Sequence, residues 1–189
     1  MKAVLQEKFG DASVLLIGNA DKPTAEKDQV VIKVTATTIN RADIIQREGN
    51  YNQPPGDSPI LGLEVAGVID ELGPSVTDFK TGERVMSLVG GGGYAEYATA
   101  YARHLIRIPQ SMTFEEAACV CETYITAYLN IFMLGRLQHT ETVLLHGGGG
   151  GVNTAAIQLC KNLTPEVTVI VTASPGKINR VKTLGADQV

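Results

Sequence analysis

The sequence predicts a β-rich barrel domain followed by the opening of a βαβ unit, and three observations carry this prediction. The first half of the chain contains short, β-branched apolar runs, separated by turn signals such as "NQPPGDSP" and "LGPSVTDFKTGE". Near residue 110 the pattern changes to helical spacing. The last part has the order strand, glycine run, helix and strand, which is typical of a βαβ unit.

The strands of the first half are expected in three places. Residues 30–39, "VVIKVTATTI", are β-branched and partly alternating. Residues 62–73, "GLEVAGVIDELG", are small and apolar with a glycine at each end. Residues 83–100, "ERVMSLVGGGGYAEYATA", are interpreted as two strands, with the glycines at 90–93 forming a tight connection between them.

A helix is expected to begin after Thr113, because Glu116 stands three residues later as in a capping box. Gly135 is its expected end. The apolar positions that recur at helical spacing are Ala117, Val120, Tyr124, Ala127, Tyr128 and Ile131. Cys119 and Cys121 are interpreted as core or near-core thiols without a catalytic role.

The βαβ pattern begins with the strand "TVLLH" at 142–146 and continues with the strand "VTVIVTA" at 167–173. A short helix with the sequence "GKINRVKTLGAD" follows, closed by Gly185. The helix between the strands is expected to bury Val152, Ala155, Ala156, Leu159, Cys160 and Leu163. A doubly wound sheet needs more strands than these two, so we expect a longer protein or a truncated form.

Composition limits the function classes. A net charge of −4 and a pI near 5.4 disfavour a nucleic-acid or anionic-membrane surface. The three cysteines have no partners at metal-ligand spacing, which favours a reduced, cytoplasmic compartment. The amino-terminal "MKAVLQEKF" lacks the apolar region of a signal peptide, and no apolar run is long enough to cross a membrane.

The glycine run at 147–151 is the main candidate for a binding site. Glycines at a strand-to-helix turn let the backbone approach a pyrophosphate, and the helix amino terminus offers N–H groups to it. The predicted contacts are Gly148, Gly149, Gly150, Gly151, Val152 and Asn153. A dinucleotide loop normally has a third glycine or alanine where this chain has Val152, Asn153 or Thr154, so Asn153 is expected to cost space. A flexible linker is the alternative.

NADPH is preferred over NADH as the predicted cofactor. Enzymes that prefer NAD usually place an acid at the end of the second strand, to bind the ribose 2′-hydroxyl. No acid occurs between Val167 and Ala186. Thr172, Ser174, Lys177 and Arg180 stand there instead, and hydroxyls and cations suit a 2′-phosphate. The alternative is that Lys177 and Arg180 are solvated helix residues.

Three stretches together resemble the zinc-independent quinone oxidoreductases of the medium-chain dehydrogenase/reductase superfamily. They are "NRADIIQREGNYNQPPG", "PILGLEVAGVIDELG" and "HGGGGGVNTAAIQLCK". The likeness is strongest to the zeta-crystallin-like branch with the tumour-suppressor-inducible quinone oxidoreductases. It implies a GroES-like catalytic and substrate domain at 1–120 and a partial Rossmann NADPH-binding domain at 121–189. It also implies a homodimer or homotetramer when the protein is full length.

The resemblance further implies the site residues. Zinc-dependent members hold a metal with Cys, His and Glu, where this chain has Asn40, Leu63 and Glu64, so no zinc is expected. Tyr51 is expected to contact the substrate or supply a proton, and Asn40 to lie near the nicotinamide. The remaining implied residues are Asp43, which orients Asn40, and Thr126, which faces the nicotinamide.

The implied reaction is NADPH-dependent hydride transfer to a quinone or another conjugated carbonyl. Three alternatives stay open for the site residues: Asn40 and Asp43 as a helix cap, Tyr51 as an exposed loop aromatic, and Thr126 as an ordinary helix residue. Two alternatives stay open for the function. One is a 2-enoyl thioester or alkenal reductase, and the other is a truncated, inactive form that only binds NADPH.

Overall fold

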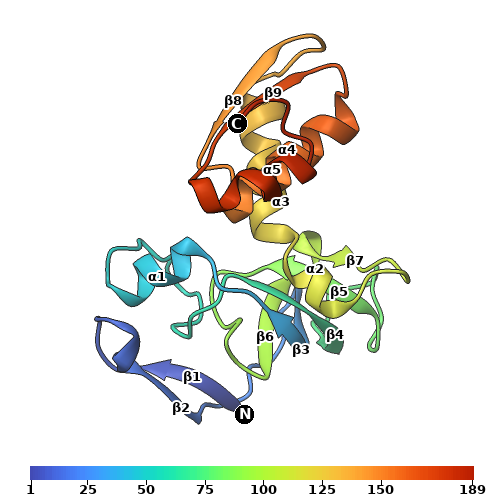
Figure 1. Cartoon of the computed structure of the whole chain (residues 1–189). Coiled ribbons are helices and arrows are strands. Elements are labelled where there is room, and N and C mark those ends of the chain that lie inside the picture. The colour runs from blue at the N-terminus through green and yellow to red at the C-terminus, as the bar shows by residue number, and fades with distance from the viewer. The chain divides into compact units, whose positions relative to one another are not determined.

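The structure is a computed structural model that describes all residues from 1 to 189, and it divides into two compact units (Figure 1). Met1–Cys121 is called the first domain and Glu122–Val189 the second domain. The boundary expected from the sequence, between residues 120 and 121, lies one residue away. Each domain is described by itself.

The first domain is built on a five-stranded antiparallel sheet with the order β6-β3-β4-β5-β7. A separate antiparallel pair, β1-β2, is linked to the domain by a bridge between Ala3 and Ala95. The strands are β1 Lys2–Gln6, β2 Leu15–Asn19, β3 Gln29–Thr37, β4 Glu64–Leu72, β5 Arg84–Leu88, β6 Tyr97–Tyr101 and β7 Ile106–Arg107.

The central strands β3 and β4 are apolar on both faces because each face meets its own core. Val30, Ile32 and Val65 lie in one cluster of buried side chains. Ala66 lies in a second cluster, which the helix α2 (Phe114–Ala118) covers through Ala117. This explains why "VVI" in β3 is buried without interruption.

The glycines at 90–93 do not form the tight connection that the sequence predicted, because β5 and β6 lie on opposite sides of the β3–β4 pair. The segment instead packs against the loop before β4. The Gly92 N–H donates to the Ile60 carbonyl at 2.6 Å, and the Gly93 N–H donates to the Gly62 carbonyl at 3.0 Å. Strand order is a long-range property, which residue spacing does not reveal.

The capping box before α2 is confirmed: the Glu116 N–H donates to Thr113 Oγ1 at 3.2 Å, and the Thr113 N–H donates to Glu116 Oε2 at 2.9 Å. The expected single helix is interrupted at Cys119 and resumes as α3, Cys121–Tyr128. Cys119 is therefore exposed, against the prediction, whereas Cys121 is buried. A π-helical segment, Leu129–Leu134, follows and ends at Gly135 as predicted.

The second domain contains two parallel strands, β8 (Thr142–His146) and β9 (Thr168–Thr172), joined by α4 (Gly151–Leu163). A 3₁₀ turn, Pro175–Lys177, leads into α5 (Ile178–Thr183). Gly185 closes this helix at φ 110°. The predicted βαβ order is thus confirmed.

The buried face of α4 differs from the predicted one at its two ends. Ala155, Ala156 and Cys160 are buried as expected, but Val152 and Leu163 are exposed. Ile157, which the sequence pattern did not select, is fully buried. The helix therefore meets the core through its middle, where it packs with Val169 and Val171 of β9.

A third strand begins beside β9. The Asp187 N–H donates to the Val169 carbonyl at 2.9 Å, and the Val171 N–H donates to the Gln188 carbonyl at 2.9 Å. Lys161 of α4 holds this segment through a 2.6 Å ion pair with Asp187, and its Nζ also donates to the Val167 carbonyl. The sheet thus contains one more pairing than the sequence predicted.

Candidate functional site

The turn between β8 and α4 is a tightly packed structure, which argues against the flexible-linker alternative. Gly147 has φ 77°, a left-handed conformation that favours glycine. A Cβ at Gly148 would overlap the Val171 side chain of β9, so only glycine fits there. The turn therefore packs directly against β9 at Gly148.

Thr172, at the end of β9, ties this turn to the sheet. Its Oγ1 accepts the Gly147 N–H at 3.0 Å, and its carbonyl accepts the Gly148 N–H at 2.9 Å. His146 Nδ1 lies 3.4 Å from the same hydroxyl. Thr172 therefore shapes the loop through both its hydroxyl and its carbonyl.

Asn153 answers the question that the sequence raised about the third position. Its Nδ2 donates to the His146 carbonyl at 2.5 Å, from the first turn of α4 back to the end of β8. The side chain therefore closes the turn as a hydrogen-bonded link, where a standard dinucleotide loop relies on close packing of glycine. The amide is thus directed to the strand carbonyl, and its effect on a bound phosphate stays a prediction.

The amino terminus of α4 fits an anionic group. The helix begins at Gly151 with Gly150 as its N-cap residue, and no side chain caps it. The N–H groups of Gly151, Val152 and Asn153 lie in the first turn, where no helical carbonyl precedes them. These donors and the positive end of the helix dipole suit a pyrophosphate.

The predicted 2′-phosphate residues lie beside this turn. Lys177 is exposed, and its side chain lies against Gly149, with Nζ 3.5 Å from the Gly149 carbonyl. Ser174 is also exposed and is the N-cap residue of the 3₁₀ turn that carries Lys177. The structure thus brings Thr172 and Lys177 together around the glycine loop.

Thr126 lies in α3, and its carbonyl accepts the Asn130 side-chain amide at 2.8 Å. One turn earlier on the same helix, Thr123 lies against Gly151, since a Cβ there would be 3.0 Å from Thr123 Cγ2. The amino terminus of α4 therefore packs on α3. The sequence analysis did not select Thr123, because a contact between two helices leaves no signal in local spacing.

A second polar cluster lies in the first domain, at the start of α1 (Arg41–Arg47). Asn40 and Asp43 form a capping box in which the Asn40 N–H donates to Asp43 Oδ2 at 2.7 Å. The Asn40 amide also donates to Glu64 Oε1 at 2.8 Å and to Thr38 Oγ1 at 3.1 Å. Asn40 is thus the cap of the helix, and its catalytic role stays a prediction.

Burial governs the ionisation of this cluster. Asp43 is 2% exposed, and burial raises the pKa of its carboxyl above the usual value, opposed by the hydrogen bond from the Asn40 backbone. Burial likewise raises the pKa of the Tyr94 hydroxyl, and the neighbouring Asp43 carboxylate raises it further. Tyr94 was not selected from the sequence, where it stands unmarked after a glycine run.

Tyr51 forms no hydrogen bond with Asn40 or Asp43. It is 37% exposed and lines a different cavity, of about 380 Å³, together with Gln46 and Gln53. The structure therefore brings two of the three predicted catalytic residues together and places the third on this cavity wall.

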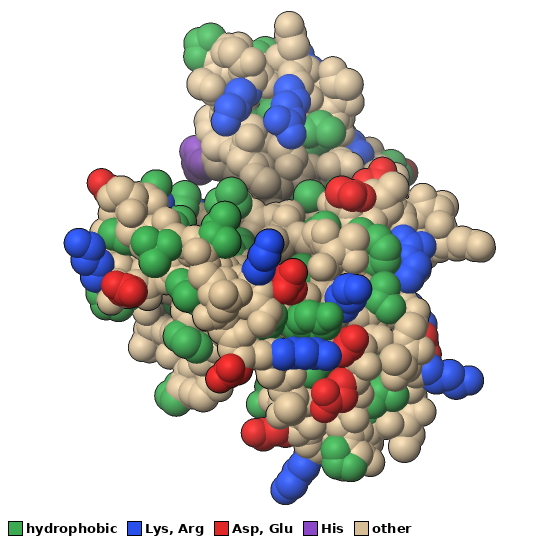
Figure 2. Space-filling model, turned by 90° about the horizontal axis from the view of Figure 1, so that it is seen from below, with side chains coloured by type: hydrophobic (Ala, Val, Ile, Leu, Met, Phe, Trp, Pro, Cys, Tyr) green, Lys and Arg blue, Asp and Glu red, His purple; other side chains and the backbone are tan.

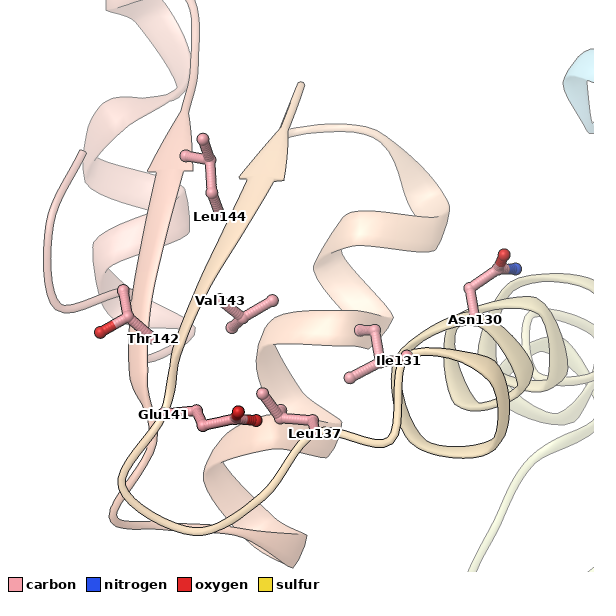
Figure 3. Close-up of a pocket in the computed structure, with 8 residues that line it drawn as sticks. Asn130, Ile131, Leu137, Glu141, Thr142, Val143 and Leu144 are labelled. Carbon is pink, nitrogen blue, oxygen red and sulfur yellow. The ribbon is translucent and has the colours of Figure 1, made fainter.

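A metal centre and the cavity beside β8 remain as candidates for a site. No group of three His, Cys, Asp or Glu side chains among residues 1–189 is arranged to hold a metal ion. A cavity of about 410 Å³ lies beside β8, where Ile131, Leu137 and Val143 converge and Asn130 points away (Figure 3). Three of its lining side chains, Ile131, Leu137 and Val143, pack against the apolar core of the second domain.

The surface and the helices add two observations. Figure 2 shows Lys and Arg side chains interspersed with Asp and Glu over the face in view. No helix of the structure combines the length and the apolar character that crossing a membrane would require.

Comparison with known proteins relates this geometry to a family. Residues 26–110 match the alcohol dehydrogenase GroES-like domain. The synaptic vesicle membrane protein VAT-1 homolog-like of Mus musculus is 35% identical over 182 residues, which cover 96% of this chain and 43% of that protein. The chain therefore spans less than half the length of this relative.

Two solved structures share the fold over the whole chain. The quinone oxidoreductase from Coxiella burnetii is 33% identical, with a TM-score of 0.91, and is itself covered to 61%. A mycobacterial protein complexed with NADPH is 30% identical, with a TM-score of 0.90, and is covered to 58%. Both comparisons cover 100% of this chain. With its GroES-like domain and the opening of a Rossmann fold, the chain belongs to the medium-chain dehydrogenase/reductase superfamily.

Proposed function

We propose that the chain supplies the substrate domain and the first nucleotide-binding unit of an NADPH-dependent quinone oxidoreductase that works without zinc. The observation that carries this proposal is the glycine turn with uncapped helix N–H groups, beside which Lys177 lies and no acid ends β9. The similar quinone oxidoreductase and the similar protein complexed with NADPH support it.

Each group has a proposed task. The first-turn N–H groups of α4 hold the pyrophosphate, and Thr172, Ser174 and Lys177 hold the 2′-phosphate. Thr126 faces the nicotinamide, which supplies the hydride when the cofactor is bound.

In the first domain, Tyr51 contacts the acceptor or supplies the proton. Asn40 lies near the nicotinamide, and Asp43 positions Asn40 through the hydrogen bond to its backbone. The metal-ligand positions of zinc-dependent relatives are taken by Asn40, Leu63 and Glu64. Of these, Leu63 is buried and Glu64 accepts hydrogen bonds from Thr38 and Asn40, which supports a reaction without zinc.

The test is a calorimetric titration of the chain with NADPH and with NADH. Lys177→Ala is expected to weaken NADPH binding about tenfold, because a charge-assisted hydrogen bond to phosphate is lost, and to leave NADH binding nearly unchanged. Lys182→Ala, an exposed lysine on α5, is the matched control and is expected to change neither. Equal loss for both cofactors in Lys177→Ala would contradict the assignment of the 2′-phosphate site.

Turnover separates the remaining candidate functions in the full-length protein. Reduction of quinones with NADPH supports the proposed function. A strong preference for enoyl thioesters or alkenals would identify the alternative reductase, and NADPH binding without reduction of any acceptor would identify a non-catalytic form.

We also propose that the full-length protein is a cytoplasmic homodimer or homotetramer that binds no nucleic acid and no membrane. Sedimentation of the full-length protein tests the oligomeric state, and fractionation of cells tests the location and the membrane association. A monomer in sedimentation, or recovery with membranes, would contradict the proposal.

A further inference from the structure

A small cavity in the first domain has a wall that the proposed reaction does not explain. It has a volume of about 380 Å³ and lies where the segment after β1 meets the end of α1. Its lining combines a glutamine from each of three segments, Gln6, Gln46 and Gln53, with the apolar side chains of Phe9 and Leu61. Three amide side chains on one cavity wall place several polar groups where bulk water has little access, and each of them needs a hydrogen-bond partner.

Backbone carbonyls, which only accept hydrogen bonds, fix the orientation of the Gln53 and Gln6 amides, and Gln53 in turn fixes the orientation of Gln46. Gln53 Nε2 donates to the carbonyls of Ser58, at 2.5 Å, and Gly90, at 3.3 Å. Gln53 Oε1 must therefore accept, and it does so from Gln46 Nε2 at 3.2 Å. Gln6 Nε2 donates to the Arg47 carbonyl at 2.9 Å. An amide flip would place nitrogen against a donor or oxygen against oxygen.

Two oxygens are left over by this arrangement. Gln46 Oε1 and Gln6 Oε1 are buried and accept no hydrogen bond, although both side chains line the cavity. Gln46 is only 7% exposed, so water does not readily satisfy its oxygen from outside. A buried acceptor without a donor is unfavourable, and a ligand that brings a donor relieves it.

The other residues that line the cavity indicate which kind of ligand would fit it. Phe9 is 70% exposed and Tyr51 is 37% exposed, and both offer ring surface at the cavity. Glu7 and Lys8 also border it with opposite charges, which favours a neutral molecule over an ion. The volume suits a single small ring system rather than a nucleotide.

We propose that this cavity is a binding site for a small, neutral aromatic molecule that carries hydroxyl or amide N–H donors. The ring packs on Phe9 and Tyr51, and the donors reach Gln46 Oε1 and Gln6 Oε1. An aromatic molecule of the same shape that only accepts hydrogen bonds is rejected, because it leaves both oxygens without a donor. The site shares Tyr51 with the proposed acceptor contact, but binding at the two glutamine oxygens requires neither the cofactor nor the reduction.

The experiment uses two probes with the same ring and the same two oxygens, one with hydrogen-bond donors and one in which methyl groups replace the donor hydrogens. The isotope-labelled 189-residue chain is titrated with resorcinol, which has two O–H donors, and with 1,3-dimethoxybenzene, in which both are capped. Resorcinol is expected to shift the backbone amide signals of Gln6, Gln46 and Tyr51 and the side-chain amide signals of the two glutamines in NMR spectra, whereas 1,3-dimethoxybenzene is expected to leave them in place.

Two variants locate the effect. Gln46→Met keeps the volume and removes the acceptor, and it is expected to weaken resorcinol binding about tenfold. Gln6→Met is an independent second variant, with the same expected direction, in case the first does not fold. Gln158→Met in α4 is the matched control, since it makes the same change in the other domain and is expected to keep the wild-type affinity.

Three results would overturn the proposal. One is equal binding of both probes, because the ring and not the donors would then be recognised. Another is unchanged resorcinol affinity in the folded Gln46→Met or Gln6→Met chain. The third is the absence of any shift at the cavity residues with millimolar resorcinol.

Discussion

The chain contains two glycine runs that look alike in sequence and differ in structure. The run at 90–93 in the first domain uses its N–H groups internally, since Gly92 and Gly93 donate to the carbonyls of Ile60 and Gly62. The run at 147–151 in the second domain ends in a helix, whose first-turn N–H groups have no helical acceptor. One run joins two backbone segments, and the other presents donors.

The difference shows that a glycine run by itself does not indicate a ligand. In both runs glycine is required because a Cβ would overlap a neighbour: the Ser58 carbonyl at Gly91 and the Val171 side chain at Gly148. What separates them is the element that follows. A helix leaves donors unpaired, whereas an extended segment that packs against a loop pairs them.

The largest effect is expected from adding a methyl group at Gly148 or at Gly91, because the glycine backbone there directly contacts its neighbour. Gly148→Ala is expected to destabilise the second domain by about 1–3 kcal/mol and to abolish NADPH binding, because the turn must open to accommodate the methyl group. Gly91→Ala is expected to destabilise the first domain by a similar amount and to leave NADPH affinity unchanged. Chemical denaturation and calorimetry measure the two quantities separately.

Gly176→Ala is the control for this comparison. A Cβ there would meet no atom within 4 Å, so the variant is expected to fold and to bind. If Gly91→Ala reduced NADPH affinity as strongly as Gly148→Ala, the assignment of different roles to the two runs would be wrong.

A smaller effect is expected at Asn153, which links the second run to its strand. Asn153→Ala removes the hydrogen bond to the His146 carbonyl and is expected to cost about 1 kcal/mol of unfolding free energy. NADPH affinity is expected to stay within about threefold, because the amide is bonded to the strand carbonyl. A tenfold gain in affinity in Asn153→Gly would instead show that the asparagine crowds the phosphates.

The smallest effect is expected at acidic pH, where the stabilities of the two domains are expected to change in opposite directions. Burial raises the pKa of Asp43 above 3.8, so protonation favours the folded first domain as the pH falls towards 3.8. The hydrogen bond from Lys161 lowers the pKa of Asp187 below 3.8. Its contribution is therefore present above 3.8 and is lost as the pH falls through the folded-state pKa.

Amide exchange followed residue by residue measures the stability of each domain across this pH range. Asp43→Asn is expected to remove the acid stabilisation of the first domain. Asp187→Asn is expected to remove the acid sensitivity of the second domain. The change in unfolding free energy is expected to be less than about 1 kcal/mol, because the Lys161–Asp187 ion pair is partly exposed. Parallel responses of the two domains in the wild-type chain would contradict this account.

Local patterns predicted the elements well. The capping box of Thr113 and Glu116, the helix end at Gly135 and the order strand, glycine turn, helix and strand are all confirmed. Each depends on residues close together in the sequence, where backbone hydrogen bonding and side-chain spacing act directly.

Features that join distant segments were not predictable in this way. The place of residues 90–93 depends on the order of strands in the sheet, and the contact of Thr123 with Gly151 depends on the packing of two helices. The role of Asn153 depends on the direction of one side chain. The glutamine cavity combines Gln6, Gln46 and Gln53, which no spacing rule relates.

The pairing of residues 187 and 188 with β9 has a consequence for the side of the sheet on which the helices of the second domain lie. The strands follow one another across the sheet in chain order, so both crossovers advance in the same direction. Right-handed crossovers that advance in one direction place their helices on one side. Accordingly α4 and α5 share a core with Val169 and Val171, whereas Leu144, which points to the opposite side from its neighbour Leu145, stays 53% exposed.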